Sequence, residues 1–356
     1  MEYTTREAVL ALAQPDPEFE AFIAECPLPK RNPQATLEQM REEFARAEEL
    51  EYASFAKLGV EEAMTIPMRD GYQSHIRICK PPTLPADGSP LVALIYGGGF
   101  AMGTNRQLSS FAHSFTAAFG ATVVLLSYRL APEHKFPTAP RDIWDSVQWL
   151  SMNASDLGAD TSQGFIIGGF SAGAALAIVT AHQAVRDNLS FLTGLWTCHL
   201  GATDGKNVPE KYKPLFLSRE QNKDAPCLTV EDIDVFQALY APDFTSEDYV
   251  PFVNESTFAK MFPTYVQVAG LDPLRDDGLV YEKALRDAGV KTRLDVYPGV
   301  PHGHHLYFPW LKQSLKTRRD AVEGLGWLLG REIGVERAVL DRFFSSFAML
   351  GGQRQN

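Results

Sequence analysis

The feature that most constrains the fold of this chain is a serine flanked by glycines, in Gly169-Phe170-Ser171-Ala172-Gly173. The apolar run 164–168 precedes it and the apolar run 174–179 follows it, which predicts a short buried strand, a sharp turn and a helix. Glycines are expected on both sides because side chains would collide where the chain doubles back. The first N–H groups of the helix would point toward charge that develops beside the hydroxyl. We therefore predict that Ser171 is a nucleophile at a strand-to-helix corner.

The rest of the chain alternates apolar strands with helices. Two segments of alternating polarity, separated by the turn signal Arg69-Asp70-Gly71, predict an antiparallel hairpin at the start of the sheet. The predicted strands are 63–68, 73–79, 91–95, 121–126, 165–168, 195–199, 264–268 and 293–297, and the predicted helices are 109–119, 140–150, 172–186, 230–240 and 278–288. Continuous apolar strands separated by helices indicate an α/β fold with a mostly parallel sheet covered on both faces.

Three regions depart from this alternation. Residues 1–60 are helical in character and charged, with one apolar stripe that must cover a core built later. Residues 203–255 are polar and contain prolines, and an insertion of this length after a strand is usually functional. Residues 332–356 carry one more amphipathic helical pattern.

A serine nucleophile needs a base and an acid that orients the base. Asp272 lies just past the end of the predicted strand 264–268, and His302 lies just past the end of the next strand, 293–297. Because the carboxyl ends of parallel strands meet at one edge of the sheet, both side chains should reach Ser171. We predict that Asp272 and His302 complete a catalytic triad.

Alternatives exist for both partners. Asp276 or Asp277 can replace Asp272, although their position favours a capping role at the start of the next helix. His304 or His305 can replace His302, although either is equally compatible with a surface position. The remaining histidines are predicted to be structural or exposed; they are His75, His113, His134, His182 and His199.

A run of three glycines follows the strand 91–95. Glycines at a strand end let backbone N–H groups approach a ligand, which suits an oxyanion hole. We predict that Gly97, Gly98 and Ala172 supply its donors, with Gly99 as the alternative to either glycine. A phosphate-binding loop is disfavoured because no Lys-Ser/Thr pair follows.

Taken together, these motifs resemble the hormone-sensitive-lipase-like branch of the α/β-hydrolases. The resemblance covers roughly residues 60 to 330 and rests on the segments 97–100, 127–137, 169–173, 272–276 and 302–303. It implies an α/β-hydrolase fold and carboxylic-ester hydrolysis without a metal or organic cofactor. It also implies a helical cap built from residues 1–60 and from the insertion 203–255. The cap is expected to cover a catalytic domain of residues 61–331. A helical extension of residues 332–356 is expected to follow that domain.

Two residues depart from the family pattern. Tyr96 stands where the family usually has a histidine that braces the glycine loop, and Phe170 stands where it usually has an aspartate. Tyr96 is expected either to brace the loop differently or to line the acyl pocket. We predict that Tyr96, Gly99, Phe100 and Phe170 contact the substrate.

Composition limits the partners. A net charge of −11 and a pI near 5.3 disfavour nucleic acid and anionic membrane surfaces. The chain shows no secretory signal and no apolar run near the roughly 20 residues of a membrane span. Its four cysteines have no metal-ligand spacing, so free thiols and a cytoplasmic location are expected.

The expected substrate is a small to medium, hydrophobic or aromatic ester, and a homodimer through the C-terminal segment is possible. Acyl transfer, lactonisation or thioester release on the same site is the alternative activity, because the insertion is rich in aromatic residues. A ligand receptor without activity is disfavoured, because such proteins typically lose a member of the triad.

Overall fold

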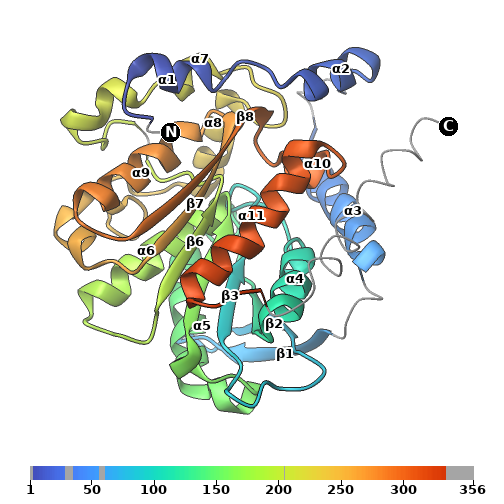
Figure 1. Cartoon of the computed structure of the whole chain (residues 1–356), viewed down its shortest axis with the longest axis vertical. Coiled ribbons are helices and arrows are strands. Elements are labelled where there is room, and N and C mark those ends of the chain that lie inside the picture. Colours follow the sequence, from blue (N-terminus) through green and yellow to red (C-terminus); the bar gives the residue numbers. More distant parts are fainter. Residues whose placement is uncertain (1–2, 29–34, 56–60, 204, 334–356) are drawn as a thin grey trace.

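A central sheet of eight strands organises the protein in a computed structural model, which describes residues 3–28, 35–55, 61–203 and 205–333 (Figure 1). Its spatial order is β1-β2-β4-β3-β5-β6-β7-β8. The strands are β1 (Glu61–Pro67), β2 (Gln73–Cys79), β3 (Leu91–Ile95), β4 (Thr122–Leu126), β5 (Phe165–Phe170), β6 (Gly194–Cys198), β7 (Thr264–Leu271) and β8 (Thr292–Pro301). The hairpin β1–β2 is antiparallel and joins β4 antiparallel, and all other neighbours are parallel. The predicted fold class is confirmed.

Helices cover both faces of the sheet (Figure 1). One face packs against α5 (Thr138–Asn153), α6 (Ala172–Arg186) and α9 (Arg275–Asp287), and the other against α4 (Ser109–Phe119) and α11 (Lys312–Leu329). Successive residues of a strand point to opposite faces, so a strand covered on both sides must be apolar throughout. The residues of β3 show this alternation: Leu91, Ala93 and Ile95 join one core cluster, and Val92 and Leu94 join the other.

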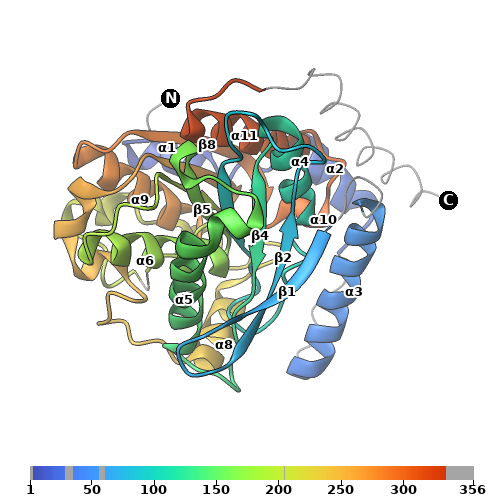
Figure 2. The ribbon, with the colours of Figure 1, turned by 90° about the horizontal axis from the view of Figure 1, so that it is seen from below.

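The first two helices pack at the edge of the sheet formed by β7 and β8. Val9 of α1 (Arg6–Ala11) lies in a cluster with Val268, and Phe19 of α2 (Pro17–Glu25) packs against Phe308 at 5.3 Å between ring centroids. Asp16 caps α2 through the N–H groups of Glu18 and Phe19. The third helix, α3 (Leu37–Phe55), lies separately, along the β1 side of the molecule (Figure 2).

The insertion consists of short helices. They are η3 (Glu210–Leu215), α7 (Ser218–Gln221), α8 (Val230–Tyr240), η4 (Pro251–Val253) and η5 (Glu255–Lys260). A helix is present where the sequence predicts one, at 230–240, and a capping box between Thr229 and Asp232 starts it. Three further short elements are η1 (Ala154–Leu157), η2 (Thr161–Gln163) and α10 (His304–Tyr307).

Two expectations for the C-terminal part have different outcomes. Helix α11 has no counterpart among the predicted elements, although it covers much of one face of the sheet. The predicted extension 332–356 lies outside the described residues from position 334 onward. None of the helices in the described part of the chain has the length and apolar character that a bilayer span requires.

Candidate active site

Ser171 lies at a sharp corner between β5 and α6. Its backbone has φ 55° and ψ −121°, a conformation that non-glycine residues rarely adopt. A Cβ atom on Gly169 would lie 2.4 Å from the carbonyl carbon of Gly173, and one on Gly173 would lie 2.1 Å from the carbonyl oxygen of Ile95. The two glycines of the motif are therefore required by the close approach of the backbones around Ser171.

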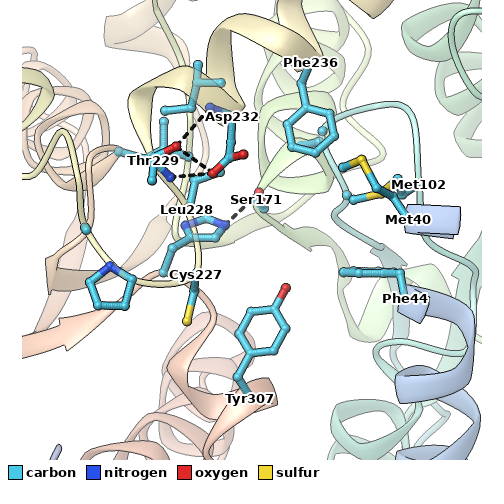
Figure 3. A pocket seen from close by; sticks show the side chains of 18 of the residues that line it. Met40, Phe44, Met102, Ser171, Cys227, Leu228, Thr229, Asp232, Phe236 and Tyr307 are labelled. Carbon is cyan, nitrogen blue, oxygen red and sulfur yellow. Dashed lines mark hydrogen bonds between the residues drawn. The ribbon is translucent and has the colours of Figure 1, made fainter. Parts of the chain in front are cut away.

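Three side chains from separate strand ends form one hydrogen-bonded line. The Ser171 hydroxyl lies 3.0 Å from His302 Nε2, the bond drawn from Ser171 in Figure 3. His302 Nδ1 lies 2.7 Å from Asp272 Oδ2. A carboxylate only accepts, so Nδ1 carries the proton and Nε2 is left as the acceptor for the serine hydroxyl. The second oxygen of Asp272 accepts the N–H of Leu274 at 2.8 Å, which fixes the carboxylate.

Asp276, one alternative to Asp272, has a different environment. Its carboxylate accepts the N–H of Ser218 at 2.6 Å and that of Leu217, and it pairs with the buried guanidinium of Arg275 at 2.6 Å. It lies in the first turn of α9 without capping that helix. Asp276 thus joins residues 217 and 218 of the insertion to α9, and its predicted role as a helix cap is wrong.

Asp277, the other alternative, also binds the insertion. Its Oδ1 accepts the N–H groups of Ala202 at 2.9 Å and Thr203 at 3.0 Å, and its Oδ2 lies 3.1 Å from Arg219 Nη2. Burial raises the pKa of Asp277 to about 6, and the nearby Arg219 guanidinium opposes that shift. Of the three aspartates, it is Asp272 that the structure brings to His302.

His304 and His305 are both fully buried, so a surface role is wrong for either. His304 bonds the carbonyl of Pro301 and the hydroxyl of Thr317. Both ring nitrogens of His305 lack a hydrogen-bond partner among the described residues, and its ring packs edge-on against Phe170 at 5.2 Å. Burial lowers the pKa of His304 to about 3 and that of His305 well below its ordinary value. The imidazole that bonds Ser171 is His302.

His199, predicted to be structural or exposed, is buried and lies beside His302 with 5.4 Å between their ring centroids. Its Nδ1 accepts the N–H of Gly303 at 2.9 Å. Burial lowers the pKa of His199 well below its ordinary value, and the neighbouring His302, His304 and His305 lower it further. The ring of His199 is therefore neutral. The signal for its importance was available, because His199 directly follows β6 at the catalytic edge of the sheet.

Cys198, His199 and His305 have donor atoms within 4.8 Å of one another, a set that soft metal ions favour. A neutral imidazole has one free lone pair, and that of His199 is directed at Gly303. Its other nitrogen then carries the proton and cannot bind a metal. The residues present therefore fit a packed structural cluster rather than a metal centre.

The glycine loop requires one correction. The N–H of Gly97 is donated to Gln107 Oε1 at 2.7 Å, so the predicted oxyanion donor Gly97 is not available. Among the described residues, no acceptor contacts the N–H groups of Gly98, Gly99 or Ala172, and these three residues line the cavity at Ser171. Gly99, the alternative named from the sequence, replaces Gly97 in the set of free donors.

The four predicted substrate contacts separate into two groups. Gly99, Phe100 and Phe170 line the cavity, and Phe170 also packs against the His302 ring at 5.2 Å. Tyr96 does not belong to the cavity wall formed by the described residues. Its ring stacks on Tyr128 at 4.5 Å and its hydroxyl donates to the Tyr128 carbonyl at 3.2 Å. Tyr96 thus braces the glycine loop from inside the core, and a substrate contact at this residue is wrong.

A cavity of about 1250 Å³ opens above Ser171 and His302. Figure 3 shows side chains from several segments around it. The segments are α3, the glycine loop, the insertion and α10, through Met40, Phe44, Met102, Cys227, Leu228, Phe236 and Tyr307. Apolar residues dominate this wall, and most of them were not identified from the sequence because no local pattern shows which face of a cap helix meets a cavity.

The fold and the geometry at Ser171 together define an α/β hydrolase. Comparison with known proteins agrees. Residues 92–306 match the family described as alpha/beta hydrolase fold. An AB hydrolase superfamily protein of Schizosaccharomyces pombe is 37% identical over 265 residues, which cover 74% of this chain and 78% of that protein. Versiconal hemiacetal acetate esterase of Dothistroma septosporum is 32% identical, covering 70% of this chain and 76% of that protein.

Solved structures are similar as well. The crystal structure of vibralactone cyclase superposes with a TM-score of 0.83 at 30% identity, covering 90% of this chain and 96% of that one. An esterase of Pyrobaculum calidifontis has a TM-score of 0.74 at 27% identity, covering 88% and 98%. The chain belongs to the hormone-sensitive-lipase-like family of α/β hydrolases, as the resemblance predicted, and it is an enzyme of the esterase class.

Proposed function

We propose that the protein hydrolyses carboxylic esters through an acyl-enzyme formed on Ser171. The Ser171 oxygen attacks the ester carbonyl while His302 Nε2 accepts its proton, and His302 then returns the proton to the departing alcohol. Water repeats the sequence, releases the acid and restores the serine. Asp272 holds the imidazole and stabilises its protonated form. The observation that carries this proposal is the hydrogen-bonded line Asp272–His302–Ser171, with bonds of 2.7 and 3.0 Å.

Each tetrahedral intermediate places a negative charge on the former carbonyl oxygen. We assign its stabilisation to the N–H groups of Gly98, Gly99 and Ala172, which border the cavity at Ser171 without another acceptor among the described residues. The N-terminus of α6 adds its positive dipole end at the same point. Donors held in place beforehand gain most from this charge because they need no rearrangement.

The cavity supports a hydrophobic or aromatic ester as the substrate. Its volume of about 1250 Å³ exceeds the range of roughly 300–1,000 Å³ of most small-molecule sites, and its wall is largely apolar. We further propose that residues 1–60 and 203–255 act as the cap, since α3 and α8 both contribute to that wall.

Lactonisation or transfer of the acyl group to another alcohol is the second candidate. The solved structure of vibralactone cyclase, at 30% identity and a TM-score of 0.83, supports it. A hydroxyl of the bound acyl chain, rather than water, would then attack the acyl-enzyme. Mass spectrometry of the products with added alcohol distinguishes the two, since only the free acid is expected from a hydrolase.

The principal test is Ser171→Ala, assayed on p-nitrophenyl esters from acetate to octanoate. Turnover should fall by at least about 10³-fold, because the triad acts as a unit. Labelling by a fluorophosphonate should disappear in the same variant. The control is Ser162→Ala, which removes an exposed serine of η2, at the opposite end of β5 from Ser171, and should keep full activity. Unchanged turnover or labelling in Ser171→Ala would refute the proposal.

A further inference from the structure

The cap helix α3 is hydrogen-bonded to the glycine loop through the buried carboxylate of Glu48 and through Arg41, whose Nε donates to the carbonyl of Ala101 at 2.8 Å. Glu48 of α3 is 7% exposed, and its Oε1 accepts from Gln107 Nε2 at 3.2 Å. Gln107 Oε1 in turn accepts the N–H of Gly97 at 2.7 Å. This Glu48–Gln107–Gly97 chain joins the cap to the residue directly before the two proposed oxyanion donors.

The carboxylate fixes the orientation of the Gln107 amide. An amide side chain has one donor end and one acceptor end, whereas a carboxylate only accepts. Glu48 therefore holds the Gln107 NH₂ group on its own side and leaves the oxygen for Gly97. The second Glu48 oxygen accepts from the Thr104 hydroxyl at 2.8 Å, so both oxygens are bound to the same loop.

The loop that receives these bonds is tight. Gly98 has φ +128°, and a Cβ atom there would lie 2.3 Å from the carbonyl oxygen of Met102. The carbonyl of Gly98 accepts the N–H groups of Ala101 and Met102 at 3.1 and 2.9 Å. A rotation of the peptide that carries the Gly97 N–H would therefore be transmitted to Gly98, because the turn leaves little freedom between them.

The same face of α3 reaches the cavity. Met40 and Phe44 precede Glu48 by eight and four residues, so the three lie along one stripe of the helix. Met40 and Phe44 line the cavity wall, and Figure 3 shows both beside Met102 of the glycine loop. One helix thus contacts the space for the substrate and the loop beneath it.

We infer that Glu48 and Gln107 are positioning residues, which hold the glycine loop so that the Gly98 and Gly99 N–H groups face the oxyanion. Correct docking of the cap helix and formation of the oxyanion hole are then coupled. This inference rests on the proposed function, because it concerns the same site. It adds a role for two side chains that do not contact the reacting atoms.

The disruptive variants are Gln107→Leu and Glu48→Leu, which remove the chain at either end. Each should lower kcat by roughly 10- to 100-fold with little change in KM, because the displaced donors act on the transition state. The double variant should be no slower than the slower single variant, since residues of one hydrogen-bonded unit are not additive. Titration of active sites with a fluorophosphonate corrects every rate for protein that has not folded.

Two further variants distinguish positioning of the glycine loop by Glu48 and Gln107 from a general effect of contacts that hold α3 in place. Glu48→Gln keeps an oxygen for Gln107, and the Thr104 hydroxyl can rotate to accept from the new NH₂ group, so kcat should stay within about threefold of the wild type. Glu133→Gln weakens the exposed ion pair of Arg41, on the same helix, at 2.8 Å. It leaves the Glu48–Gln107–Gly97 chain intact and should keep the wild-type kcat.

Three results would overturn the inference. They are a wild-type kcat in Gln107→Leu, an equal loss in Glu133→Gln and Glu48→Leu, and effects that multiply in the double variant. A failure of the proposed function is recognised separately, because Ser171→Ala would then retain turnover. Loss of activity in Ser171→Ala together with a wild-type kcat in Gln107→Leu refutes the inference alone.

Discussion

The backbone N–H of Gly303 donates to His199 Nδ1 at 2.9 Å, so a second histidine holds the peptide that follows His302. Gly303 has φ 67° and His199 has φ 52°, and both lie at strand ends near Ser171. His302 is therefore restrained twice, at its ring by Asp272 and at its backbone by His199.

Replacement of His199 should impair catalysis without abolishing it. In His199→Ala the Gly303 N–H loses its buried acceptor, which costs roughly 1–3 kcal/mol and frees the segment that carries His302. We expect kcat to fall about tenfold and the melting temperature to drop. His199→Asn, whose side-chain oxygen can accept, should recover part of kcat. Equal kcat values for His199→Ala and the wild type would contradict this role.

Asp272→Asn should leave the fold intact and remove most activity. The asparagine can still accept the Leu274 N–H through its oxygen, and its NH₂ group then faces His302. The imidazole would turn to the wrong tautomer, with its proton on Nε2. In serine enzymes of this type such a change lowers kcat by roughly 10⁴-fold. Steady-state kinetics on a short p-nitrophenyl ester measures the loss, and a decrease below tenfold would count against the assignment.

Phe236 of α8 should control which esters fit. A Cβ atom on Gly99 would lie 2.3 Å from the Phe236 ring, so this ring covers the proposed oxyanion donor directly. Phe236→Ala should lower kcat/KM for acetate esters by about tenfold through lost apolar contact, and should affect octanoate esters less. Asp234→Ala is the control, because it changes an exposed residue of the same helix outside the cavity wall. The measurement is the ratio of kcat/KM for acetate esters to kcat/KM for octanoate esters. This ratio should fall in Phe236→Ala and stay unchanged in Asp234→Ala.

Asp277 should make stability depend on pH in a predictable direction. Burial raises its pKa from 3.8 to about 6, so the folded protein binds this proton more tightly than the unfolded chain. The stabilisation is complete below pH 3.8 and is lost as the pH rises toward about 6. Relative to Asp277→Asn, the free energy of unfolding should fall by about 3 kcal/mol across this window. Urea unfolding at each pH tests it, and parallel curves for the two proteins would contradict the prediction.

Much of this fold follows from local patterns. The strands were predictable because burial on both faces demands continuous apolar runs, as in β3. The convergence of Ser171, Asp272 and His302 was predictable because each directly follows a strand that ends at the same edge. Helix α11 was missed even though Leu315, Val322 and Leu325 recur at helical spacing along it.

The errors at the site have a common cause. Whether the N–H of Gly97 is free depends on Gln107, which follows it by ten residues and whose side-chain oxygen accepts that N–H. Whether Tyr96 meets the substrate depends on Tyr128, which lies on the neighbouring strand end. Both questions are decided by contacts between residues that are distant in the sequence. The periodic pattern of apolar residues does not show which distant residues meet.

The ion pair between the buried Asp277 and the partly exposed Arg219 also limits how such enzymes can be recombined. A chimaera that takes residues 203–255 from a relative without an arginine at position 219 would leave Asp277, with 0% exposure of its side chain, facing no cation. Leaving one partner of a buried ion pair behind costs several kcal/mol. Cap exchange in this protein should therefore transfer the arginine with the cassette, or replace the aspartate by asparagine.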